Sequence, residues 1–291
     1  MLIPLSDILA RADTPPDWLC DPFLPRRGIT YLHGKTSIGK SPLTWELARC
    51  VSQGLDFFGH TTTASKVLYI EADGALELLS PRLKLLPQPV GTWHWAFLAG
   101  TSPDLANDGH SVHQRLAGYQ AQLAPGLVIW NTLRQFYKGP ANDSDTVPRV
   151  YGAMLRAFPQ AGHLVIAHDK KAASAEHPTP DEENFSGSGA WRDLATVALH
   201  LAPRGTVHGP YLALEHTKSQ VSELCEPLKY TLDADGTRIH PLAHPLGPRL
   251  LTLMARRGVS VLDAETVTQA MKELKCSRKT LFRVLASVRE S

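Results

Sequence analysis

The sequence has no long hydrophobic run and no secretory signature. No apolar stretch in its 291 residues approaches the roughly 18 residues that a membrane-spanning helix needs, and the longest are strand-sized. The amino-terminal segment has no basic stretch followed by an apolar run, so we expect no signal peptide. Apolar residues make up 43% and charged residues 20% of the chain, which excludes a disordered or collagen-like protein.

Cysteine is scarce and scattered. The four cysteines Cys20, Cys50, Cys225 and Cys276 lie far apart and form no C-x-x-C pair. This spacing argues against a disulfide framework and against a zinc cluster, and it is typical of a reducing compartment. We therefore expect a cytoplasmic protein that has no membrane partner.

Net charge is almost absent, but the charge is unevenly distributed. The segment Arg249–Ser291 holds nine Lys or Arg against four Asp or Glu, whereas the remainder holds 21 against 24. A neutral body with a basic end favours contact with nucleic acid at the carboxyl-terminal end. A solvated helical surface would give the same balance, so charge alone leaves both interpretations open.

Short apolar runs alternate with amphipathic segments through most of the chain. This order predicts an α/β fold with a central, mainly parallel sheet. The expected strands are Gly28–His33, Lys66–Ile70, Trp93–Leu98, Leu127–Asn131 and His163–His168. The expected helices are Ser41–Gln53, Leu76–Leu86 and Val150–Phe158. Three further strands, expected as antiparallel additions at one edge, are Thr196–Ala202, Tyr211–His216 and Leu228–Leu232.

Two long polar stretches interrupt this order. Lys138–Pro148 and Lys170–Gly189 each follow the end of an expected strand. Loops of this length inside a compact domain usually carry function, and α/β proteins bind ligands at the carboxyl ends of their strands. We therefore expect both stretches to act as functional loops.

The chain changes character after Pro241. In Asp263–Leu274 and Arg278–Glu290 the apolar residues recur at the spacing of a helix with one buried face. The connection between them is short and contains Ser277, a suitable helix N-cap. This outline predicts a winged-helix or helix-turn-helix module, although a helical dimerisation cap would look alike. We therefore divide the chain into an α/β domain over residues 1–240 and a small helical module over residues 241–291. The module's expected DNA contacts are Arg278, Lys279 and Arg283.

The strongest motif is G-x-x-x-x-G-K-[ST] at residues 34–41, between an expected strand and an expected helix. In such a P-loop, backbone N–H groups surround a polyphosphate and the helix N-terminus faces the anion. Lys40 would reach the β- and γ-phosphates, and the Ser41 hydroxyl would bind Mg²⁺. Pro42 falls in the first helical turn, where a missing N–H costs little. The motif predicts ATP and Mg²⁺ as cofactors. The expected nucleotide-binding residues are Gly34, Lys35, Thr36, Ser37, Ile38, Gly39, Lys40, Ser41 and Pro42.

Nucleotide hydrolysis also needs an acid beside the metal and a group that orients water. The strand that should end in the metal-side Asp ends in Asn131, whose amide brings no negative charge to Mg²⁺. Asp73 is the candidate for activating water, with Glu71 as its reserve on the same side of an extended chain. A solvated acidic loop is the alternative for these two acids. His168, at the end of another strand, is a candidate contact to the γ-phosphate.

These segments resemble RepA-type plasmid and phage helicases, which are hexameric RecA-fold ATPases. The resemblance rests on Leu24–Gly34 running into the P-loop, on Val67–Gly74 followed by Arg82-Leu83, and on Leu127–Leu133. It implies a RecA-like core for residues 15–235, with Asp73 in the place of the catalytic acid. It also implies that Lys218 is the finger that reaches a neighbouring subunit's nucleotide. Lys138, Lys170 and Lys171 would then contact single-stranded DNA in a central channel.

Two functions are consistent with this sequence. The first is an ATP-driven, ring-forming motor of the DNA helicase type that serves DNA replication. Such a motor would be a homohexamer and would act on single-stranded or duplex DNA. The second is an ATP-binding assembly factor that binds DNA and hydrolyses ATP weakly or not at all. Asn131, Asp73 and the lack of an arginine beside Lys218 favour weak hydrolysis. A small-molecule kinase is a third option that the basic end disfavours.

Overall fold

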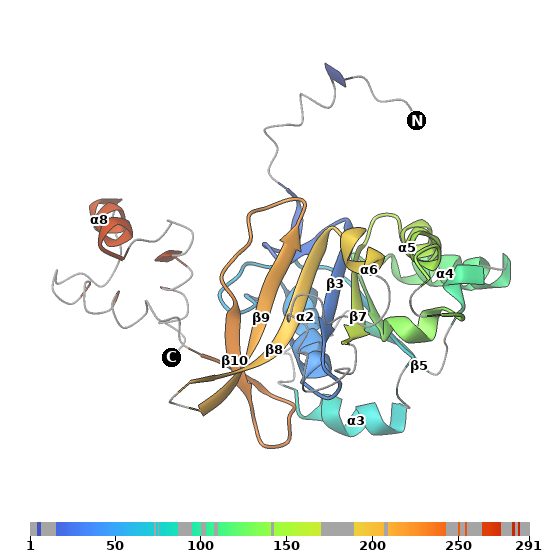
Figure 1. Ribbon diagram of the computed structural model, residues 1–291, viewed down its shortest axis with the longest axis horizontal. Helices are drawn as coiled ribbons and strands as arrows, with labels where there is room; N and C mark the ends of the chain where they lie inside the picture. The colour runs from blue at the N-terminus through green and yellow to red at the C-terminus, as the bar shows by residue number, and fades with distance from the viewer. Residues whose placement is uncertain are drawn as a thin grey trace, which may run out of the picture.

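The computed structural model describes residues 5–6, 16–72, 74, 76–86, 95–99, 103–107, 110–140, 143–169, 189–206, 209–242, 250, 254, 264–274, 281–282 and 285. Its centre is a nine-stranded sheet in the order β11-β10-β9-β8-β3-β7-β6-β4-β5 (Figure 1). The six strands from β8 to β5 in this order are parallel, and β9, β10 and β11 extend the sheet in antiparallel fashion. The expected α/β class with a mainly parallel sheet is confirmed.

The strands match the apolar runs of the sequence closely. Because the central strands are buried on both faces, they are continuous apolar runs rather than alternating ones. The parallel strands are β3 (Gly28–Gly34), β4 (Val67–Glu71), β5 (Trp95–Ala99), β6 (Leu127–Asn131), β7 (Gly162–His168) and β8 (Val197–Thr206). The antiparallel strands are β9 (Gly209–Ser219), β10 (Leu228–Leu232) and β11 (Ile239–Pro241). A separate hairpin pairs β1 (Trp18–Cys20) with β2 (Leu24–Pro25).

Helices cover both faces of the sheet, and two hydrophobic clusters fill the space beneath them. One cluster joins α2 (Lys40–Gln53) and α3 (Leu76–Lys84) to the sheet; the other joins α4 (His110–Leu123) and α5 (Thr146–Ala157) to the opposite face (Figure 1). Strand β3 shows the alternation, because Leu32 belongs to the first cluster and Tyr31 to the second. The short elements η1 (Leu105–Asn107), η2 (Leu133–Phe136) and α6 (Ala190–Asp193) lie on the second face.

Several details differ from the sequence-based expectations. Helix α5 begins at Thr146, so the polar stretch expected as the loop Lys138–Pro148 is partly helical. Strand β8 pairs with β3 in parallel and not as an antiparallel addition. Helix α4 was not expected, because its many polar residues weaken the apolar periodicity. The loop Lys170–Gly189 lies, except for Gly189, outside the described residues.

After residue 242 the structure describes only residues 250, 254, 264–274, 281–282 and 285. Helix α8 spans Ala264–Leu274 and so matches the first of the two helices expected there. Its Val267 and Ala270 are buried, as are Leu281 and Leu285 of the second expected helix. The helix-turn-helix arrangement and the domain boundary at residue 240 stay predictions. None of the helices in the described ranges is long and apolar enough to cross a membrane.

One buried histidine makes the fold sensitive to acid. His163 on β7 is fully buried; its Nδ1 accepts a hydrogen bond from Trp130 Nε1 at 3.2 Å, and its Nε2 contacts the carbonyl of Phe158 at 3.2 Å. This pattern fits a neutral ring, and burial lowers the pKa of His163 to about 4. The unfolded chain therefore binds the extra proton at higher pH than the folded chain does, and stability falls as pH drops from about 6.5 towards 4.

We expect His163 to remove about 2 kcal/mol from the free energy of unfolding when the pH is lowered from 7 to 5. His163→Gln keeps an acceptor and a donor but does not titrate, so this variant should lose that part of the pH dependence. Urea denaturation at both pH values measures it. His240→Gln, which replaces an exposed histidine, is the matched control. Equal pH slopes for His163→Gln and wild type would contradict the assignment.

Candidate functional site

The P-loop lies at the carboxyl edge of the parallel strands, between β3 and α2. The register pairs Gly34 at the end of β3 with His168 at the end of β7, and it pairs Asn131 at the end of β6 with Glu71 at the end of β4. Parallel strands that end at one edge bring their last residues together, and ligands of α/β proteins bind there. Four chain segments far apart in sequence therefore meet around the P-loop.

The loop conformation depends on its second glycine. Gly39 precedes α2 with φ +106° and ψ 20°, a conformation that L residues rarely adopt. A Cβ at this position would also lie 2.8 Å from Leu232 Cδ1. Helix α2 then begins at Lys40, and Pro42 falls in its first turn, as expected. The unsatisfied N–H groups of this turn consequently face the loop, as anion binding requires.

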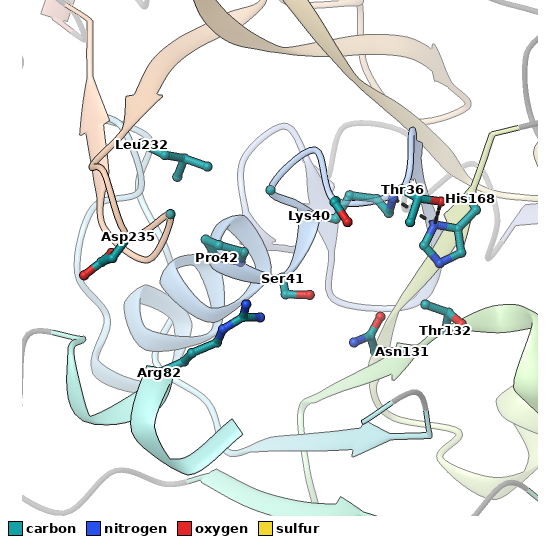
Figure 2. Close-up of a pocket in the computed structure, with 13 residues that line it drawn as sticks. Thr36, Lys40, Ser41, Pro42, Arg82, Asn131, Thr132, His168, Leu232 and Asp235 are labelled. Atoms are coloured by element: carbon teal, nitrogen blue, oxygen red, sulfur yellow. Dashed lines mark hydrogen bonds between the residues drawn. The ribbon is translucent and has the colours of Figure 1, made fainter. Parts of the chain in front are cut away.

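Lys40 is held across the loop by main-chain oxygens. Its Nζ donates to the carbonyls of Gly34 and Lys35, both at 2.7 Å, and lies 3.2 Å from His168 Nδ1. Thr36 Oγ1 lies 3.4 Å from the same ring nitrogen. The expected phosphate-binding lysine and the expected γ-phosphate contact His168 are thus brought together at one point, as Figure 2 shows.

A pocket of about 440 Å³ opens over this loop. Eight of the residues expected at the site line it: Thr36, Ser37, Gly39, Lys40, Ser41, Pro42, Asn131 and His168 (Figure 2). Gly34, Lys35 and Ile38 belong to the loop but do not line the pocket. The geometry therefore brings together six of the nine residues expected to bind the nucleotide, with Asn131 and His168 beside them.

Five further lining residues were not expected. They are Arg82 from α3, Thr132 after β6, and three residues of the β10–β11 hairpin, namely Leu232, Asp235 and Gly236. The hairpin turn is anchored to α3, because Arg238 Nε donates to the Leu85 carbonyl at 3.1 Å. The Asp-Gly pair of this turn is a residue pair typical of hairpins, but nothing local to it indicates which site the turn reaches. Arg82 and Lys40 give this pocket two cationic side chains, which suits a polyphosphate.

Asn131 and Glu71 form a buried pair at the base of the site. Asn131 Nδ2 donates to Glu71 Oε2 at 2.7 Å, and the two residues are only 5% and 2% exposed. The main chain joins the same strand ends, because the N–H of Ala72 donates to the Asn131 carbonyl at 2.7 Å. Glu71, the reserve acid of the sequence analysis, thus lies directly behind the expected metal-side residue. Asp73, the preferred acid, lies outside the described residues.

A row of ionisable side chains crosses the sheet beside the P-loop. His33 Nδ1 lies 2.8 Å from Asp169 Oδ1, and His200 Nε2 lies 3.5 Å from Asp169 Oδ2. His200 Nδ1 also lies 3.3 Å from Glu215 Oε2, and Arg204 Nε donates to Glu215 Oε1 at 2.9 Å. Asp169 follows His168 directly, so this partly buried row supports the residue that contacts Lys40.

The charge states along this row follow from its hydrogen bonds. Burial alone would raise the pKa of Asp169, but hydrogen bonds from His200 and His33 outweigh burial and lower it to about 2. Burial lowers the pKa of His33, whereas the contacts of His200 with two carboxylates outweigh burial and raise its pKa. The row thus holds an ionised Asp169 between a neutral His33 and a His200 that favours the charged form.

Lys218 lies away from the pocket. It pairs with Ala198 on β8, and Ala198 pairs with Tyr31, three residues before the P-loop end of β3. Its Nζ donates to the carbonyls of Arg192, Asp193 and Ala195 at 2.5–3.1 Å, which caps the end of α6. Within this chain Lys218 therefore stabilises a helix end.

The residues expected to contact nucleic acid are mostly outside the described part of the chain. Lys138 is described; it is exposed and follows η2 at the carboxyl side of β6. Lys170, Lys171, Arg278, Lys279 and Arg283 fall outside the described residues. Their roles stay predictions.

A family model described as an AAA domain, AAA_25, matches residues 3–174, which is more than half of the chain and includes the P-loop and the ends of β4, β6 and β7. The chain belongs to this AAA domain family. No curated protein is significantly similar to it in sequence. Membership in this family implies that the protein binds a nucleotide, and the P-loop motif makes the pocket the candidate site for it.

Solved structures give the fold of this AAA domain protein. A solved ATPase domain matches with a TM-score of 0.56 at 9% identity, over 82% of this chain and 96% of that domain. The flagellar accessory protein FlaH from Methanocaldococcus jannaschii matches with a TM-score of 0.51 at 10% identity, with the same coverage. The fold is therefore RecA-like, as expected.

Proposed function

We propose that this AAA domain protein is an ATP-driven motor of the DNA helicase type that works as a ring, most simply a homohexamer, in the cytoplasm and in DNA replication. The observation that carries the proposal is the contact of Lys40 Nζ with His168 Nδ1 beside a pocket at the carboxyl ends of β3, β6 and β7. A group on β7 that touches the phosphate-binding lysine can transmit the state of the γ-phosphate to the chain that follows it. In this protein that chain is Lys170–Gly189, the expected DNA-contacting loop.

The residues around the pocket fit ATP with Mg²⁺. The P-loop amides and Lys40 would bind the phosphates, Arg82 and the β10–β11 turn would flank the rest of the nucleotide, and the Ser41 hydroxyl would hold the metal. Asn131 would hold a metal-bound water through its amide oxygen. Bound Mg²⁺ would neutralise charge on the phosphates during transfer. Asp73 would activate the attacking water, and Lys218 would have to leave its carbonyls to reach a neighbouring subunit.

One observation favours a second function. The pocket holds an amide and not a carboxylate at the end of β6, so the site carries less negative charge towards Mg²⁺ than phosphoryl-transfer sites usually do. In this alternative, ATP organises an assembly of the protein on single-stranded or duplex DNA and is hydrolysed weakly or not at all.

Steady-state ATP hydrolysis with Mg²⁺, measured with and without single-stranded DNA, separates the two functions. The motor predicts turnover that single-stranded DNA stimulates severalfold and that Lys40→Ala abolishes. Tight ATP binding without turnover, together with ATP-dependent self-association in analytical ultracentrifugation, would support the assembly factor. Absence of ATP binding would reject both.

A further inference from the structure

Glu71 and Asn131 are register partners on adjacent parallel strands, and the carboxylate stands on the strand farther from the P-loop. The sheet order places β7 between β3 and β6, and β4 beyond β6. Asn131 lines the pocket together with Ser41, whereas Glu71 is buried behind Asn131 and does not line the pocket. The acid therefore reaches the pocket through the amide that donates a hydrogen bond to it.

The hydrogen bond determines which way this amide faces. A carboxylate oxygen only accepts, so the group within 2.7 Å of Glu71 Oε2 must be the NH₂ of Asn131 and not its carbonyl. Turning the amide round would set two buried acceptors against each other, which costs about 1–3 kcal/mol for a buried unsatisfied group. The Asn131 oxygen is consequently the amide atom available to the pocket, and Figure 2 shows the Asn131 side chain at the pocket below Ser41 and Lys40.

We propose that Glu71 is a positioning residue for the metal side of the nucleotide site. In this pair the amide lines the pocket and the carboxylate lies behind it, which is the reverse of a site whose carboxylate faces the metal; we call this reversal the swap. Glu71 aims the oxygen of Asn131 into the pocket and places a negative charge directly behind it. The proposal rests on the proposed nucleotide function. Residues behind a metal ligand typically change metal affinity by about 10- to 100-fold when they are replaced.

The swap can be reversed by exchanging the two side chains. Glu71→Gln keeps an acceptor for Asn131 but removes the charge and the preference for one amide orientation. Asn131→Asp places two carboxylates side by side in a buried site, which is unfavourable without a cation. In Glu71→Gln/Asn131→Asp the hydrogen bond returns with reversed polarity, because the introduced glutamine amide on β4 donates to the introduced carboxylate at the pocket.

Two measurements on the full chain test this inference. The first is the urea unfolding midpoint of the four proteins without nucleotide. We expect Asn131→Asp to lower the midpoint and the double variant to recover most of that loss. The second is the affinity for a fluorescent ATP analogue, measured with Mg²⁺ and with EDTA. Glu71→Gln should reduce the increase in affinity that Mg²⁺ produces by about tenfold and leave the affinity in EDTA unchanged. The double variant should recover the increase in affinity with Mg²⁺.

Failure of the inference and failure of the proposed function give different results. If wild type does not bind the analogue, the proposed function is wrong. If wild type binds it and Glu71→Gln keeps the full gain from Mg²⁺, or if the double variant is no more stable than Asn131→Asp, the positioning role is wrong. Glu77→Gln removes an exposed carboxylate from the neighbouring helix α3 and serves as the control, for which we expect wild-type values in both measurements.

Discussion

Lys40→Ala is expected to weaken ATP binding by about 10- to 100-fold, because one or two hydrogen bonds between an ammonium and a phosphate contribute about 1.5–3 kcal/mol. The side chain is 5% exposed and already lies at the centre of the loop. Replacing it also removes the two hydrogen bonds that link the carbonyls of Gly34 and Lys35 without nucleotide. The loop of this variant should therefore be less ordered before ATP arrives.

Titration of the variant with a fluorescent ATP analogue in EDTA measures the lysine's contribution without that of Mg²⁺. Lys66→Ala, which truncates an exposed lysine just before β4, is the matched control and should bind as wild type does. A Lys40→Ala protein that keeps its unfolding midpoint and still binds with wild-type affinity would remove Lys40 from the phosphate site, and with it the identification of the pocket.

The sequence predicted those features that depend on neighbours in the chain. Apolar runs located the central strands to within two residues at each end, and the glycine and lysine spacing located the loop that α2 follows. The position of His168 at the end of an expected strand made it a candidate for the site, and the structure places it beside Lys40. In each case the signal is local, because a strand, a helix start or a loop motif occupies consecutive residues.

Features that depend on which strands are neighbours could not be predicted. The contact between Asn131 and Glu71 spans 60 positions and exists because β6 and β4 share a register. Arg82 reaches the pocket because the β10–β11 turn and α3 converge on α2, which no sequence spacing encodes. From the sequence Glu71 was only a reserve acid, because its hydrogen bond with the Asn131 amide depends on the pairing of β4 with β6.

Asp169→Ala is expected to lower the free energy of unfolding by about 3–5 kcal/mol, the usual effect of removing one partner from a buried ion pair. The side chain is 4% exposed and contacts His33 and His200 on its two sides. Without it, His200 keeps only Glu215 as an anionic partner, and His33 loses the acceptor for its Nδ1. Urea denaturation at pH 6 measures the loss; Asp56→Ala, at an exposed aspartate, should change stability by less than about 0.5 kcal/mol.

The pH dependence of this loss distinguishes an ion pair from packing. Because contacts with Asp169 and Glu215 raise the pKa of His200 in the folded chain, the stabilisation from its charged form is complete below pH 6.5 and is lost as pH rises through the raised pKa. The pKa of Asp169, about 2, keeps the carboxylate ionised over this whole range. The difference between wild type and Asp169→Ala should therefore be larger at pH 6 than at pH 9. A difference that is the same at both pH values would mean that Asp169 stabilises the end of β7 by packing and neutral hydrogen bonds, and that His168 is held beside Lys40 without the help of charge.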